Sequence, residues 1–168
     1  MPEHIRTVCL EFFGSVSDAV PSIVQITEYL KEFDSVSLAG LEHLDERYIR
    51  AVGYSTKATR SERPKMVLIA DIASNDEDEV GSVASKVVQI ANIKNGEGFI
   101  AVSAEARKRF WLDRARTAAI AKHTNAFKIN EDVVIPLPNL GRYANEIEKI
   151  NIEQSISNKL KLITELEA

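Results

Sequence analysis

The sequence predicts an α+β fold in which an antiparallel sheet carries helices on one face and additional helices follow. Three observations lead to this fold class. The 168 residues include 45% hydrophobic and 27% charged side chains, a balance typical of a globular domain. Over roughly the first hundred residues, strand-sized apolar runs alternate with segments of helical period. The rest of the chain is dominated by helical spacing, which a short proline-containing segment interrupts.

The first strand and the first helix are predicted from the N-terminal third of the chain. Residues 5–13 read IRTVCLEFF, and this run of β-branched and aromatic side chains favours a strand. From Ala19 to Phe33 apolar residues recur near the helical period, which predicts a helix. Either Ser17 or Asp18 is expected to cap its N-terminus.

The next segment is mixed and predicts a strand, a short helix and a loop. The strand is expected from Val36 to Leu44, and the helix from Asp45 to Val52. Residues 55–65, STKATRSERPK, are basic and hydroxyl-rich with almost no apolar side chain. We expect them to form an exposed loop.

The second half of the core repeats the strand and helix pattern. MVLIADI at 66–72 is a continuous apolar run of the kind found in buried strands. The segment 74–93 predicts a helix, with Ser74 or Asn75 as its cap and acidic residues over its first turn. After a turn, GFIAVS at 98–103 predicts a fourth strand.

The order strand, helix, strand, strand, helix, strand is that of the ferredoxin-like βαββαβ sandwich. We expect this core to span about residues 5–103 within a single domain that covers the whole chain. A basic helix over 104–124, an extended segment over 127–138 and a C-terminal helix over 139–168 are expected to follow.

Charge is distributed unevenly along the chain, whose formal net charge is −4. Residues 104–128 contain seven basic and two acidic side chains, a local charge of +5, so the remainder carries −9. Arg107, Trp111, Arg114 and Thr117 would share one face of a helix here. The pattern indicates either an anion-binding site or a solvated basic face that pairs with the acidic remainder.

Several classes of function are disfavoured by the sequence. The acidic balance argues against a protein that coats nucleic acid. Cys9 is the only cysteine, so no intrachain disulfide is possible, and its place within a strand favours a small buried side chain over a nucleophile. The three histidines are widely separated, which disfavours a metal site. No run approaches the ~20 apolar residues of a membrane-spanning helix, and no glycine-rich phosphate loop follows a strand.

Residues 110–138 read FWLDRARTAAIAKHTNAFKINEDVVIPLP. They contain the pair Phe110-Trp111, arginines within a helix, a threonine and an Asp-x-x-x-Pro ending at 132–136. This combination resembles the C-terminal, or cap, domain of FAD-linked oxidases of the D-lactate dehydrogenase and glycolate oxidase type. LEFFGS at 10–15 and LAGLEHLD at 38–45 look more loosely like its first two strands, so the resemblance extends over nearly the whole chain.

The resemblance implies the substrate-cap domain of an FAD-dependent oxidoreductase that oxidises a D-2-hydroxy acid such as D-lactate, by hydride transfer to the flavin. Matched residue by residue, Arg114 or Arg116, Thr117 and Lys128 would bind the carboxylate of the substrate. No catalytic, cofactor-binding or metal-binding residue is implied within this chain.

The resemblance also implies partners. The FAD-binding domain would belong to the same polypeptide, and the chain would bind no FAD and remain inactive without it. A small 2-hydroxy acid is the expected ligand, nucleic acid is not expected, and a homodimer is an open alternative. A cytoplasmic location fits the single cysteine, with association on the cytoplasmic side of a membrane as the alternative for the full-length enzyme. The competing hypothesis for function is a non-catalytic ferredoxin-like module for binding or oligomerisation.

Overall fold

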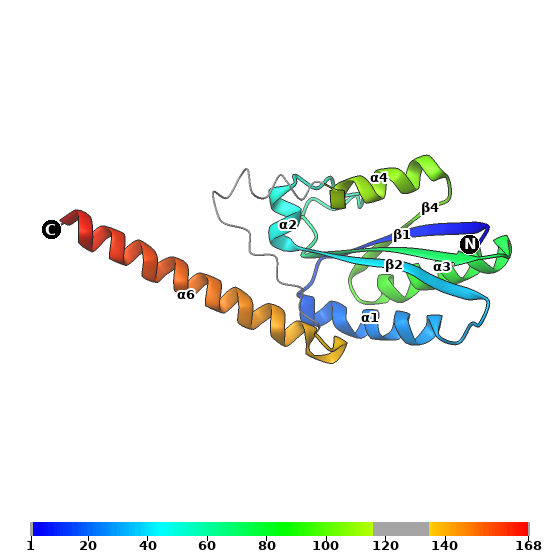
Figure 1. Cartoon of the computed structure of the whole chain (residues 1–168), viewed down its shortest axis with the longest axis horizontal. Helices are drawn as coiled ribbons and strands as arrows, with labels where there is room; N and C mark the ends of the chain where they lie inside the picture. The colour runs from blue at the N-terminus through cyan, green and yellow to red at the C-terminus, as the bar shows by residue number, and fades with distance from the viewer. Residues whose placement is uncertain (1, 116–134, 168) are drawn as a thin grey trace.

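A computed structural model describes residues 2–115 and 135–167 of the chain (Figure 1). Its centre is a four-stranded antiparallel sheet with the strand order β2-β3-β1-β4. This order and the βαββαβ succession confirm the predicted ferredoxin-like α+β fold. The strands are β1 (His4–Phe12), β2 (Val36–Asp45), β3 (Met66–Ser74) and β4 (Gly96–Ala101).

Helices lie on both faces of this sheet. The two core helices, α1 (Val16–Leu30) and α3 (Glu77–Ile93), cover one face together. A short helix α2 (Glu46–Ala51) and the helix α4 (Ala104–Ala115) lie on the opposite face (Figure 1). The one-turn 3₁₀ helix η1 (Leu137–Asn139) leads into α6 (Leu140–Glu167).

The alternation of side chains along the strands divides the core into two clusters. Leu10, Phe12 and Leu68 point toward α1 and α3, where they join the larger cluster. Their neighbours Cys9 and Val67 point to the other face and join a smaller cluster under α2 and α4. Because both faces are covered, buried residues are continuous along Thr7–Phe12 of β1 and along nearly all of β3, rather than alternating with exposed ones.

The start of α1 differs from the sequence prediction. Ser15, rather than Ser17 or Asp18, is the N-cap, and the helix runs from Val16 to Leu30 instead of from residue 19 to 33. The Ser15 hydroxyl accepts the Asp18 N–H at 3.2 Å, and the Asp18 carboxylate accepts the Ser15 N–H at 2.9 Å. This reciprocal capping box selects the residue three positions before an acid, which is why the helix begins earlier.

The cap of α3 was also predicted at the wrong residue. Asp76 caps this helix, because its carboxylate accepts the N–H groups of Asp78 and Glu79, each at 2.9 Å. The Ser74 hydroxyl, which the sequence offered as a cap, instead donates to the Glu79 carboxylate at 2.9 Å. Asn75 accepts the backbone N–H of Glu3 at 3.2 Å.

The fourth strand begins two residues earlier than predicted, at Gly96, and ends at Ala101. Gly96 pairs with Phe12 and Gly98 pairs with Leu10. A Cβ on Gly96 would lie 2.7 Å from the carbonyl oxygen of Ala91, so the strand approaches α3 more closely than a side chain would allow. The two glycines therefore belong to a packed strand rather than to the turn before it.

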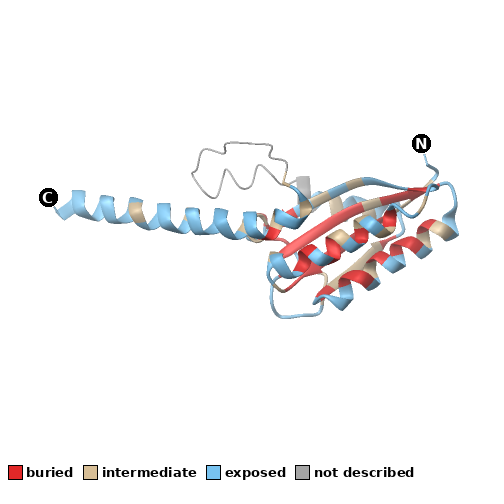
Figure 2. Cartoon of the chain, turned by 90° about the horizontal axis from the view of Figure 1, so that it is seen from below, coloured by how far each residue is buried: buried red, intermediate tan, exposed pale blue. Residues whose placement is uncertain are grey.

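The C-terminal part of the chain contains a long helix that projects from the body of the molecule (Figures 1 and 2). Leu137 and Leu140 pack against the larger core cluster and anchor its start. Beyond this anchor nearly every residue of α6 is exposed (Figure 2). Of the segment expected to be extended, residues 127–134 lie outside the described part, and its end contains the 3₁₀ turn η1.

Candidate functional site

The sheet face opposite α1 and α3, which we call the α4 face, carries the buried polar side chains Thr7 and Glu11. The pairing register places side chains of three adjacent strands on it. They are Thr7, Cys9 and Glu11 of β1, Val67, Ile69 and Asp71 of β3, and Gly40, Glu42 and Leu44 of β2.

The residues predicted to bind a carboxylate lie at or beyond the end of α4. Arg114 is in the last turn of this helix, one turn after Trp111. The side chain of Arg114, and the whole of Arg116, Thr117 and Lys128, lie outside the described residues. The helix expected over 104–124 is described as far as Ala115. The role of these four residues therefore stays a prediction.

Trp111 attaches α4 to the sheet through a hydrogen bond. Its indole Nε1–H donates to the Asp71 carboxylate on β3 at 3.2 Å. The same carboxylate oxygen accepts the hydroxyl of Thr7, the residue that faces Asp71 across the β1 and β3 pair. A Cβ on Gly40 would lie 3.8 Å from the Trp111 ring, so the indole reaches over β2 at the residue paired with Asp71.

Glu11 is a second acid on the α4 face, and it is completely buried near the end of β1. Its carboxylate accepts the Tyr54 hydroxyl at 2.6 Å and the backbone N–H groups of Lys57 and Ala58 at 2.8 and 3.0 Å. Three donors compensate for the loss of water that a buried carboxylate would otherwise suffer. Glu11 thereby holds the loop that follows α2 against the sheet.

Lys57 connects this buried acid to α4. Its ammonium donates to the Tyr54 hydroxyl at 2.8 Å and lies 4.3 Å from the centre of the Tyr54 ring. The same ammonium is 5.1 Å from the centre of the Phe110 ring on α4, within the range of a cation–π interaction. The segment 55–65, predicted as an exposed loop, is thus exposed only in part, and its first residues belong to the site.

The electrostatics of the site keep Tyr54 protonated. Burial raises the pKa of the Tyr54 phenol above its ordinary value of 10.0, and the neighbouring Cys9 and Glu11 raise it further. The Cys9 sulfur lies 3.4 Å from the Tyr54 oxygen. Cys9 is fully buried, as the sequence predicted. A neutral phenol in this position is a permanent donor to Glu11.

Sequence reasoning missed the four polar residues that organise the α4 face. These are Glu11, Asp71, Tyr54 and Lys57. A signal was present for the two acids, because each is the only carboxylate within an apolar strand: IRTVCLEFF and MVLIADI. A buried strand accepts an acid only where donors await it, so such a residue marks a polar contact on one face of the sheet. No comparable pattern marks Tyr54 or Lys57.

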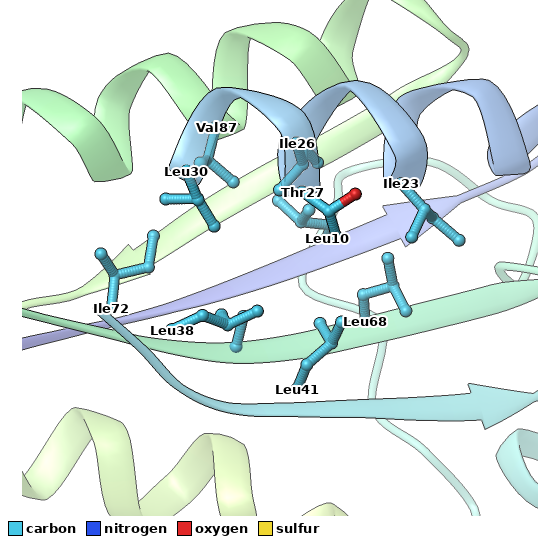
Figure 3. A pocket seen from close by; sticks show the side chains of 11 residues that line it. Leu10, Ile23, Ile26, Thr27, Leu30, Leu38, Leu41, Leu68, Ile72 and Val87 are labelled. Atoms are coloured by element: carbon cyan, nitrogen blue, oxygen red, sulfur yellow. The ribbon is translucent and has the colours of Figure 1, made fainter. Parts of the chain in front are cut away.

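A small cavity lies on the other face of the sheet, between α1 and β2 (Figure 3). Its volume is about 10 Å³, and Leu38 and Leu41 of the edge strand close it opposite Ile23 and Leu30 of α1. Its lining is almost entirely apolar (Figure 3). A space of this size holds about one water-sized sphere, so it is a packing gap and not a ligand site.

An open cleft of about 940 Å³ lies where α2, the start of α1 and the first half of α6 meet. The ion pair of Arg47 with Glu148, at 2.7 Å, joins α2 to α6. Arg50 and Lys65 both form ion pairs with Glu46, at 2.7 and 2.8 Å. Lys65, and to a smaller extent Arg50, lower the pKa of the Glu46 carboxyl below its ordinary value. Since protein carboxylates already contact these cations, the cleft is a weak candidate for an anion site.

Among the described side chains of residues 2–115 and 135–167, no three His, Cys, Asp or Glu are arranged to hold a metal ion. None of the helices described there combines the length and the apolar character needed to cross a bilayer.

Comparison with known proteins places the chain in a family. The chain has no match among curated proteins. One family model, described as FAD linked oxidases, C-terminal domain, matches residues 1–160. The match includes the whole sheet, α4 and most of α6, and it agrees with the resemblance seen around the Phe110-Trp111 pair. The chain belongs to the family of C-terminal domains of FAD-linked oxidases.

Proposed function

We propose that this chain is the substrate-cap domain of an FAD-dependent enzyme that oxidises a D-2-hydroxy acid of the D-lactate type. Family membership supports the coarser part of this proposal, an FAD oxidoreductase domain with an FAD-binding domain as its partner in the same polypeptide. The observation that carries the finer part is the attachment of α4, which bears Arg114, to the α4 face through Trp111. A cationic helix end above a sheet is suited to a small anion.

The described residues do not fit the pyrophosphate of FAD. That group is commonly bound by the N–H groups at the start of a helix that follows a strand. In this chain the N-terminal N–H groups of α1 and α3 are capped by their own Ser15 and Asp76 side chains. Acidic residues also occupy both first turns, where they would repel a phosphate. We therefore assign the flavin to the partner domain, where it supplies the redox chemistry.

The role left to this chain is to bind and orient the acid. A guanidinium grips a carboxylate through two parallel hydrogen bonds, and a neighbouring hydroxyl adds a third. Arg114 or Arg116 with Thr117 would form this clamp, and Lys128 would add charge. A clamp of this kind lowers the barrier by fixing the orientation of the substrate rather than by taking part in the bond changes.

Replacement of the arginines in the enzyme that includes the FAD-binding domain tests the clamp. Arg114→Ala and Arg116→Ala should each be compared with Arg109→Ala, since Arg109 lies on the same helix, is exposed and pairs with Glu105 at 2.6 Å. Loss of a charge-assisted contact of about 2 kcal/mol corresponds to a ~30-fold lower kcat/KM for D-lactate. We expect this decrease for at least one of the first two variants and none for the control.

Two outcomes would contradict the proposal. If kcat/KM for every 2-hydroxy acid is unchanged in the double variant of Arg114 and Arg116, these residues form no clamp. If the enzyme oxidises other substrates but no 2-hydroxy acid, the substrate class is wrong while the family remains as shown.

A second candidate function, an oligomerisation module, is favoured by α6. Ile152, Ile156, Leu160, Ile163 and Leu166 of this helix are between 49% and 78% exposed, and we call them the outer stripe. Light scattering during size-exclusion chromatography tests this role directly. A monomer at micromolar concentration would exclude it, whereas a dimer abolished by Leu160→Glu would support it.

A further inference from the structure

Asp71 stands out among the residues of β3. The strand is buried along its length except at this residue, which is intermediate in exposure. The carboxylate points to the α4 face, and one of its oxygens, Oδ1, accepts hydrogen bonds from two different elements. The donors are the hydroxyl of Thr7 on β1 and the indole of Trp111 on α4.

These two hydrogen bonds connect β1, β3 and α4 in series. Thr7 is completely buried and faces Asp71 in the register, so its hydroxyl fixes the orientation of the carboxylate. The carboxylate in turn fixes the indole of Trp111. Because a hydrogen bond is directional, this contact restricts the rotation of α4 about its axis and its distance from the sheet. Apolar packing alone would allow a range of rotations and distances.

Among the described side chains of α4, residues 104–112, Phe110 and Trp111 pack against the smaller apolar cluster, and the Phe110 ring also contacts the Lys57 ammonium. Val102 before the helix and Leu112 within it are exposed. Trp111 and Arg114 are three positions apart in α4, so their Cα atoms lie about 4.5 Å apart along the helix axis. A shift of the helix at Trp111 therefore also moves the backbone of Arg114.

We propose that Asp71 is a positioning residue, which acts through Trp111 to fix the placement of α4 and so of the carboxylate-binding end of this helix. The proposal rests on the proposed function for its effect on the substrate. The contact of Asp71 with Trp111, however, can be measured without any substrate.

The first experiment uses the fluorescence of Trp111, which is the only tryptophan of the 168-residue chain. In Asp71→Ala the indole loses its acceptor, so we expect greater quenching by acrylamide and emission at longer wavelength. In Asp71→Asn the oxygen that accepts both hydrogen bonds is retained, so the spectrum should stay close to that of the wild type. Ile72→Val is the matched control, because it perturbs the same strand on the opposite face.

The second experiment measures steady-state kinetics of the enzyme that includes the FAD-binding domain. Misplacement of a binding group by about 1 Å can lower the rate ~100-fold, so we expect a ~10- to 100-fold loss of kcat/KM in Asp71→Ala. Part of this loss should appear as a raised KM, because the clamp binds the carboxylate of the ground state, and part as a lowered kcat, because a misoriented substrate reacts more slowly. Trp111→Phe, which keeps the ring and removes the donor, should show the same increase in KM.

Four results would overturn the proposal. The first is unchanged acrylamide quenching of Trp111 in Asp71→Ala, and the second is a shifted spectrum of Asp71→Ala with an unchanged KM. The third is a double variant in which the effects of Asp71→Ala and Trp111→Phe on KM are additive. The fourth is an equally raised KM in the control Ile72→Val. If Asp71→Ala does not fold, Asp71→Asn and Trp111→Phe decide, since the proposal requires near-normal KM in the first and raised KM in the second. If D-lactate is no substrate, the proposed function fails, and KM is then measured for the substrate that the enzyme does oxidise.

Discussion

Single polar residues within the apolar strands attach a loop and a helix to the sheet of this molecule. Glu11 is the clearest case, since it is fully buried and accepts three hydrogen bonds. Without it, the hydroxyl of Tyr54 and two backbone N–H groups would lose their acceptor inside the protein. Unpaired donors in a dry site are more harmful than the missing carboxylate itself.

We predict that Glu11→Ala lowers the free energy of unfolding by about 2–5 kcal/mol, because it leaves buried donors without partners. Glu11→Gln should be less harmful, since the amide oxygen can still accept from Tyr54 and Lys57 while the amide nitrogen faces the Ala58 N–H. Urea denaturation at pH 7 followed by circular dichroism measures both. Glu62→Ala serves as the control for loss of an exposed acid, and equal effects of Glu11→Ala and Glu62→Ala would disprove the anchoring role.

At this scale the sequence indicated burial better than it indicated contacts. Cys9 was predicted as a small buried side chain, and it is one. Tyr54, whose hydroxyl contacts the Cys9 sulfur, is 45 residues away in the chain. The partner of Trp111 is 40 residues away on β3. Contacts at such separations depend on which strands become neighbours, and residue spacing alone does not carry that information.

The stability of a helix depends on the residues that cap its N-terminus. For α1 this contribution can be tested by changing the pH. Hydrogen bonds from the Ser15 side chain and backbone lower the pKa of the Asp18 carboxyl below its ordinary value of 3.8. A group with a depressed pKa stabilises the fold above its ordinary pKa and loses this effect as the pH falls through its lower folded value.

We therefore predict that Asp18→Asn is less stable than the wild type at pH 7, and that the difference in Tm disappears as the pH is lowered from about 4 toward 2. Thermal unfolding at several pH values measures this difference. Asp34→Asn, which removes an exposed carboxyl from the turn before β2, controls for the change in net charge. A difference between Asp18→Asn and wild type that persists at pH 2 would show that the charge of Asp18 is not its source.

The elements themselves were largely predictable, whereas their ends were not. All four strands and the two core helices occur in the predicted order, because their apolar periods are strong. The errors lie at caps and glycines. Ser15 and Asp76 replaced the expected caps, and Gly96 proved to be inside β4. Such ends are decided by single hydrogen bonds and close contacts, which a period of apolar residues does not record.

At the scale of the whole molecule, α6 is exposed to solvent along most of its length. The sequence suggested one apolar period along it, but two stripes occur. Leu140, Tyr143 and Ile147 line the cleft, and Leu140 also packs against the larger core cluster. The outer stripe starts at Ile152, two residues after Ile150, which is a step of about 200° around the helix. The two stripes therefore lie on nearly opposite sides of α6.

We predict that removal of residues 152–168 leaves the Tm nearly unchanged, because the side chains described between 152 and 167 are almost all exposed. Removal of residues 140–168 should lower the Tm, since Leu140 packs against the core. Differential scanning calorimetry at low and high protein concentration makes the comparison. A large decrease for the shorter truncation at low concentration would contradict the exposure of the outer stripe within one molecule.

The position of β1 in the sheet has a consequence for biosynthesis. Of the four strands of this sheet β1 is the first to be synthesised, yet it pairs with β3 on one side and β4 on the other. The second of these partners is complete only at Ala101. At about 5–20 residues per second, synthesis from Phe12 to that point takes roughly 4–18 s. Throughout this time the apolar run of β1 is without its full set of neighbours, which makes nascent chains of this protein natural clients for chaperones that shield extended apolar segments.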